Sequence, residues 1–170
     1  SKPSLVFTEE NSAIVNDPQL LVRGLEFREN SLYSTVRSGQ DIVIKLPDEP
    51  YDLTWDCSNI IFTVTDDEML FNWDCSEDMV KSITLSPIKN FDPGYSIKID
   101  SIMLNIPSVP VIDGDLEYTL RDISPMTLYS NEDQIAKSFW VASPQTYSEN
   151  EQIFYLENGL QTNSRIQPIY

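Results

Sequence analysis

The chain has 170 residues, enough for one domain with a sizeable hydrophobic core. Its 27 acidic and 11 basic residues give a net charge of −16, which repels phosphates and anionic lipids, so we expect no nucleic-acid partner and no membrane insertion. The chain has no histidine, which excludes Ser-His-Asp and Cys-His catalysis, and we expect that the protein is not an enzyme.

Short apolar runs, separated by turns rich in Pro, Gly and Asp, predict β-strands along most of the chain. In residues 41–46, for example, Ile42, Ile44 and Leu46 alternate with other residues, as in a half-buried strand. The expected strands lie at residues 4–8, 20–27, 32–36, 41–46, 60–64, 69–71, 79–85, 95–99, 102–106 and 116–120.

Two irregularities are expected within these strands. Gly24 interrupts an apolar run and indicates a bulge or a close approach of another backbone. The apolar positions are odd in residues 95–99 and even in residues 102–106. This change of parity predicts a bulge or a turn near Asp100 and Ser101.

Helix is expected in one place only, residues 131–139, as one or two turns, and residues 139–141 are alternatively a strand. The strand pattern predicts an all-β fold, an immunoglobulin-like antiparallel β-sandwich over residues 1–142. Residues 143–170 then form a C-terminal strand extension.

Part of this extension repeats the order of residue types found near the N-terminus. Residues 147–151 repeat the aromatic, hydroxyl and acidic order of residues 7–11, and an apolar run follows each copy. The extension is therefore either the first strands of a repeat or a strand exchanged with a neighbouring subunit. Folding back onto its own domain is the alternative.

The rarest residues are concentrated in one stretch, where Trp-Asp-Cys-Ser occurs at residues 55–58 and again at residues 73–76. The apolar runs between the copies predict a β-hairpin that turns at Asp66 and places Cys57 opposite Cys75. In that register the two cysteines form a cross-strand disulfide. Two buried, reduced thiols are the alternative.

Acidic clusters in predicted turns are candidate calcium ligands, because calcium takes six to eight oxygen ligands. Solvated turn residues are the simpler interpretation of the same clusters. The candidate ligands are Asp66, Asp67, Glu68, Asp113 and Asp115.

Aromatic side chains offer a second kind of candidate site, a platform for stacking sugars. In a β-sandwich the same side chains are more often part of the core. The candidates are Tyr51, Trp55, Trp73, Tyr95 and Trp140.

The acidic strands, the Pro- and Asp-rich turns and the restart after residue 143 resemble the tandem immunoglobulin-like or cadherin-like repeats of large bacterial surface proteins and adhesins. The resemblance implies an extracellular or cell-surface location and a non-enzymatic role in adhesion, surface layers or fibres. We therefore expect a structural protein whose partners are copies of itself, assembled by strand exchange at the termini. A carbohydrate-binding module, with surface glycans as partners, and a calcium-dependent adhesin repeat are the alternatives.

Overall fold

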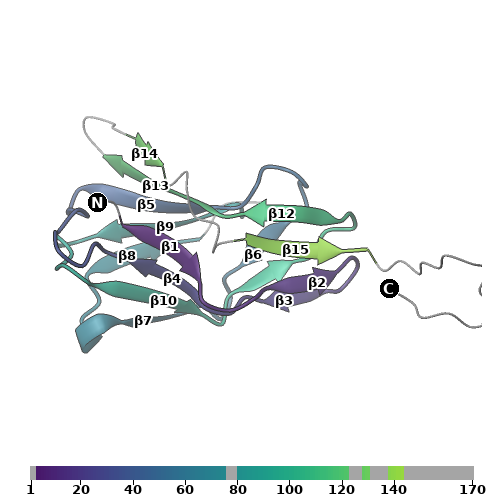
Figure 1. Cartoon of the computed structure of the whole chain (residues 1–170), viewed down its shortest axis with the longest axis horizontal. Coiled ribbons are helices and arrows are strands. Elements are labelled where there is room, and N and C mark those ends of the chain that lie inside the picture. The colour runs from purple at the N-terminus through teal and green to yellow at the C-terminus, as the bar shows by residue number, and fades with distance from the viewer. Residues whose placement is uncertain (1–2, 76–79, 123–127, 131–137, 144–170) are drawn as a thin grey trace, which may run out of the picture.

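The protein is a β-sandwich with a second, narrower set of strands at one end (Figure 1). The computed structural model describes residues 3–75, 80–122, 128–130 and 138–143. The prediction of an all-β sandwich is confirmed, and the immunoglobulin-like topology stays a prediction. Residues 144–170, nearly all of the predicted extension, lie outside the described residues.

Two antiparallel sheets form the wider part of the sandwich. The four-stranded sheet has the order β1 (Ser4–Phe7), β4 (Leu25–Arg28), β10 (Ser96–Asp100) and β7 (Ile61–Val64). The five-stranded sheet has the order β14 (Leu128–Ser130), β13 (Glu117–Asp122), β5 (Gln40–Lys45), β9 (Ser82–Pro87) and β8 (Phe71–Asp74).

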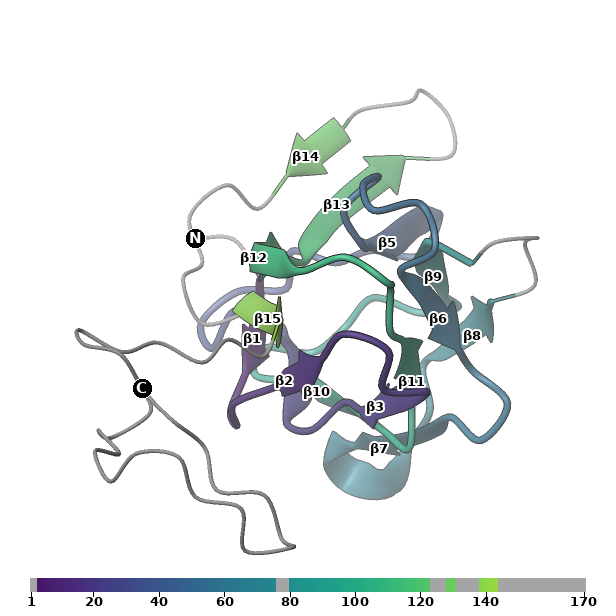
Figure 2. The same ribbon diagram turned by 90° about the vertical axis from the view of Figure 1, so that its right-hand side faces the viewer.

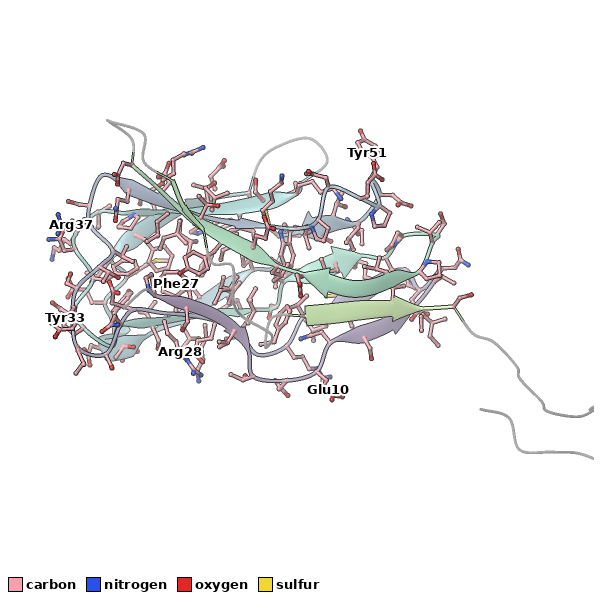
Figure 3. All side chains as sticks on the ribbon, turned by 45° about the horizontal axis from the view of Figure 1, so that its top comes forward. Glu10, Phe27, Arg28, Tyr33, Arg37 and Tyr51 are labelled. Carbon is pink, nitrogen blue, oxygen red and sulfur yellow. A yellow bond between two sulfur atoms is a disulfide. The ribbon has the colours of Figure 1, made fainter. Side chains whose placement is uncertain are left out.

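These two sheets pack face to face around one core. Phe27 of β4 meets Tyr118 of β13 edge to face, with ring centroids 5.5 Å apart, and Figure 3 places Phe27 in the interior. In β1, β5, β9 and β10 buried residues alternate with more exposed ones, as the strand period of two requires. Residues of this core with no exposed surface include Leu5, Phe27, Ile42, Ile44, Ile83, Leu85, Ile97 and Ile99.

Two three-stranded sheets form the narrower end, which Figure 2 views end-on. One has the order β3 (Gln19–Leu21), β11 (Met103–Asn105) and β6 (Thr54–Asp56). The other has the order β12 (Val111–Asp115), β15 (Ser138–Ala142) and β2 (Ser12–Ile14).

The chain passes between the wide and narrow parts at the two irregularities that the sequence predicted. Gly24 separates β3 from β4 with φ at 68°, and a Cβ atom there would lie 2.4 Å from Thr8 Oγ1. The Thr8 amide donates to the Gly24 carbonyl over 2.8 Å, so the close backbone approach is confirmed. Ser101, with φ at 56°, separates β10 from β11, and the predicted break near Asp100 is confirmed.

The predicted hairpin around Asp66 is wrong. β7 pairs with β10 and β8 pairs with β9, so the two apolar runs belong to different sheets. The connection crosses between the sheets through a short 3-10 helix, Thr65–Asp67. Tyr95, whose ring is buried in the core, hydrogen-bonds the residues that follow this helix. The Tyr95 hydroxyl donates to the Glu68 carbonyl (2.7 Å) and accepts from the Leu70 amide (3.3 Å). Because Leu70 is buried, this segment is a crossover rather than an exposed hairpin turn.

The strand predicted at residues 32–36 is also wrong, because the Glu29 carboxylate satisfies the backbone there. Glu29 is 4% exposed, and its Oε2 accepts the amides of Thr35 (2.9 Å) and Val36 (2.7 Å). Its Oε1 accepts the Asn30 amide (2.7 Å) and the Thr35 hydroxyl. This segment is therefore an ordered loop.

Of the segment predicted as helix or strand, residues 131–137 lie outside the described residues. Residues 139–141 lie in β15, so the strand alternative is confirmed for them. In the described part of the chain, no helix has the length and apolarity needed to cross a membrane.

Candidate functional site

The first candidate site is the slot that β15 occupies between β2 and β12, visible end-on in Figure 2. β15 is parallel to β2 and antiparallel to β12, and its Val141 lies opposite Ala13 on one side and Val111 on the other. Val141 is 1% exposed, and the Val15 amide donates to the Ala142 carbonyl over 3.0 Å. The last described strand thus lies between β2, near the start of the sequence, and β12, from its later part.

β15 pairs with a strand on each side of this slot. Its pairing with β2 covers three residue pairs, and its register with β12 shifts between Val111 and Gly114. Without β15, both β2 and β12 would have an unpaired edge facing the slot, and such edges are templates for another strand. The slot therefore has the chemistry of a strand acceptor.

The second candidate site is built around the disulfide. Cys57 follows β6 and Cys75 follows β8, and their Cα atoms lie 6.5 Å apart. The disulfide therefore joins two different sheets rather than two strands of a hairpin, because the crossover from β7 to β8 separates the two copies of the motif. The disulfide brings the two Trp-Asp-Cys segments, residues 55–57 and 73–75, together on one surface.

An open groove of about 610 Å³ lies along this surface, and we call it the WDC groove. Trp73 is 41% exposed in it, whereas Trp55 is 2% exposed. Phe62 packs against the Trp73 ring, with centroids 5.4 Å apart, and fixes it from behind. The groove is lined by Trp55, Asp56, Cys57, Ser58, Trp73, Asp74, Cys75, Val80 and Asn105.

Hydrogen bonds fix the polar groups along one wall of the groove. Asp56 accepts the Ser58 hydroxyl and amide on Oδ1 and Gln19 Nε2 on Oδ2, the latter over 2.7 Å. The Ser58 bonds, and then the Gln19 bond, hold the pKa of Asp56 below its ordinary value, so this side chain is a carboxylate at neutral pH. Asn105 accepts the same Gln19 amide on Oδ1 (3.0 Å) and donates to Thr54 Oγ1 (2.9 Å).

Two further polar groups at the groove have no partner within the described residues. The carboxylate of Asp74 makes neither an ion pair nor a side-chain hydrogen bond there. Trp55 Nε1 is the one buried side-chain nitrogen or oxygen of that part of the chain with no hydrogen-bond partner. An unsatisfied buried donor of this kind costs about 1–3 kcal/mol, so it is uncommon in a folded protein.

The structure does not gather the predicted calcium ligands into one site. Asp66 and Asp67 follow β7, and Glu68 pairs with Lys89 over 3.0 Å. Asp115 ends β12, in a different sheet, and the side chain of Asp113 lies outside the described residues. Over the described ranges, no group of three or more Asp, Glu or Cys side chains is arranged to hold a metal ion. Calcium binding stays a prediction.

The predicted aromatic platform is divided in the same way. Trp55 and Trp73 share the WDC groove, whereas Tyr95 is buried against Phe91, with centroids 4.6 Å apart. Tyr51 is exposed on a loop (Figure 3), and the side chain of Trp140 lies outside the described residues.

Sequence reasoning missed the acidic and amide groups of the groove. The doubled Trp-Asp-Cys carried a signal for Asp56 and Asp74, because each aspartate lies between a tryptophan and a cysteine. Asn105 and Val80 carried no such signal, because their place in the groove depends on strand pairing far along the chain.

Comparisons with protein-family models, with curated proteins and with solved structures find no match for this chain.

Proposed function

We propose that this chain is a non-enzymatic extracellular structural protein that assembles with copies of itself into a fibre, layer or adhesive array by exchanging β15. The observation that supports the proposal is the position of β15, inserted between β2 and β12 with Val141 buried in the slot. A strand from a second copy has the same sequence and can form the same backbone bonds and the same buried contact. Such an exchange is a low-cost route from monomer to assembly.

The disulfide supports the cellular setting of this proposal. Cys57 and Cys75 account for both cysteines of the chain, and disulfides persist in oxidising compartments such as the cell exterior. The net charge of −16 opposes association between copies through repulsion, which salt screens. Assembly should therefore strengthen as the ionic strength rises.

The test is the size of the particles that the full chain forms. Multi-angle light scattering after size exclusion should give a mass that grows with protein concentration and with salt. Val141→Arg should keep the chain monomeric, because a buried guanidinium prevents β15 from entering any slot.

Ala142→Arg is the matched control, because Ala142 is exposed on the same strand, and this variant should assemble like the wild type. Near-ultraviolet circular dichroism checks that both variants stay folded. A wild-type chain that remains monomeric at every concentration and salt level would contradict the proposal.

A further inference from the structure

We infer that the WDC groove binds a pyranose sugar of a neutral glycan, with Trp73 as the stacking surface and Asp56, Asp74 and Asn105 as the groups that hold its hydroxyls. This activity is separate from β15 exchange, because none of the groove residues lies in β2, β12 or β15. A volume of about 610 Å³ lies in the range of about 300–1,000 Å³ that ligand sites occupy.

Trp73 supplies the apolar part of the site. One face of a pyranose ring carries C–H groups with a small positive charge, and the face of an indole ring is negative. A chain of edge-to-face and tilted ring contacts runs from buried Phe91 through Phe71 and Phe62 to Trp73. The exposed ring is thus fixed before a ligand arrives, which reduces the ordering cost of binding.

The polar wall of the groove suits hydroxyl groups. A carboxylate accepts several hydrogen bonds, and an amide both donates and accepts, so together they match a sugar hydroxyl, which also does both. The Asp56 carboxylate and the Asn105 amide are already oriented by Gln19. The Asp74 carboxylate has no partner among the described side chains, so its acceptor capacity is available to a ligand.

The charge of the groove selects among glycans. Its described lining has two acidic residues and no basic one, so it repels sulfated, phosphorylated and uronic-acid polymers. Trp55 also lines the groove, and its buried Nε1–H has no hydrogen-bond partner. A hydroxyl of a bound sugar can accept from this donor if the groove side chains shift on binding. Two carboxylates alone are too few for calcium, which takes six to eight oxygens.

The test is direct titration of the full chain with neutral oligosaccharides of glucose, mannose and galactose, and with an oligomer of a uronic acid. Calorimetry and tryptophan fluorescence report binding. At least one neutral oligosaccharide should bind and change the tryptophan emission, and the uronic acid oligomer should not bind.

Trp73→Ala should weaken this binding at least tenfold, and Asp74→Asn should weaken it several-fold. Tyr33→Ala is the matched control, because Tyr33 is an exposed aromatic residue outside the groove (Figure 3), and it should bind like the wild type. The inference is overturned if no neutral oligosaccharide binds, if only the acidic oligomer binds, or if Trp73→Ala binds as tightly as the wild type.

Discussion

Glu29→Gln is the substitution for which the structure makes the sharpest energetic prediction. Glu29 is 4% exposed and accepts four hydrogen bonds from the loop that follows β4, two on each carboxylate oxygen. Glutamine has nearly the same shape, but its NH2 group must replace one of the two oxygens. Each oxygen accepts from at least one backbone amide, which can only donate, so the side chain cannot satisfy the loop in either orientation.

The less costly orientation puts the NH2 group where Oε1 now lies. The Thr35 hydroxyl can rotate there and accept, but the Asn30 amide loses its partner, a hydrogen bond to a charged group worth about 1.5–3 kcal/mol. The bonds from the Thr35 and Val36 amides remain but lose the charge of their acceptor, which weakens each by about 1 kcal/mol. Burying a neutral amide instead of a carboxylate offsets part of this loss, which leaves about 2–4 kcal/mol of destabilisation.

Urea denaturation, followed by tryptophan fluorescence, measures this loss as a lower midpoint with an unchanged slope. Glu10→Gln is the control, because Glu10 is exposed (Figure 3) and its substitution should change stability by less than about 0.5 kcal/mol. A loss below about 1 kcal/mol for Glu29→Gln would refute the role given to the carboxylate.

Three further perturbations test other parts of the fold. Gly24→Ala should lower the free energy of unfolding by about 1–3 kcal/mol, because the new Cβ atom would lie 2.7 Å from the backbone nitrogen of Glu9. Gly94 also has a positive φ but has open space around it, so Gly94→Ala should lower the free energy less in the same urea assay. Burial raises the pKa of Tyr118 from 10.0 to about 12. The buried hydroxyl must stay neutral, so the free energy of unfolding is unaffected by its ionisation below pH 10 and falls as the pH rises towards 12. Tyr118→Phe should therefore lose about 2 kcal/mol less than the wild type between about pH 9 and pH 11.5, and equal losses would contradict the burial of this hydroxyl. Reducing the disulfide should lower the free energy of unfolding by about 3 kcal/mol in the chain-entropy model, measured by urea denaturation with and without dithiothreitol.

The sequence predicted local features well where one residue type or one period decides them. The change from odd to even apolar positions predicted the break that Ser101 makes, because strand residues alternate between two faces. Gly24 predicted the close approach of Thr8, because only glycine leaves room for a second backbone there.

Pairing between distant strands could not be predicted in the same way. The runs that became β7 and β8 look like a hairpin, because they are apolar and close in sequence. Their partners, β10 and β9, are chosen by burial in two opposite sheets, which no local pattern records. The β15 slot and the position of Asn105 in the WDC groove depend on the same long-range pairing. The loop that the Glu29 carboxylate stabilises depends on it too, because the packed core buries this carboxylate.

The central claim, that β15 is exchanged between copies, is tested most directly by a cross-link across the β2–β15 pair. Ile14 and Ala142 are register partners in that pair and both are exposed. Two full-length single variants, Ile14→Cys and Ala142→Cys, are mixed under assembly conditions and oxidised gently. Exchange predicts a dimer on a non-reducing gel that contains one chain of each variant.

The control mixes Ala142→Cys with Ile88→Cys, an exposed position outside β2, β12 and β15, and should give no such dimer. A double variant that carries both Ile14→Cys and Ala142→Cys shows whether the pair forms within one chain. If the first mixture stays monomeric while this double variant links within one chain, β15 remains in its own domain and the account is contradicted.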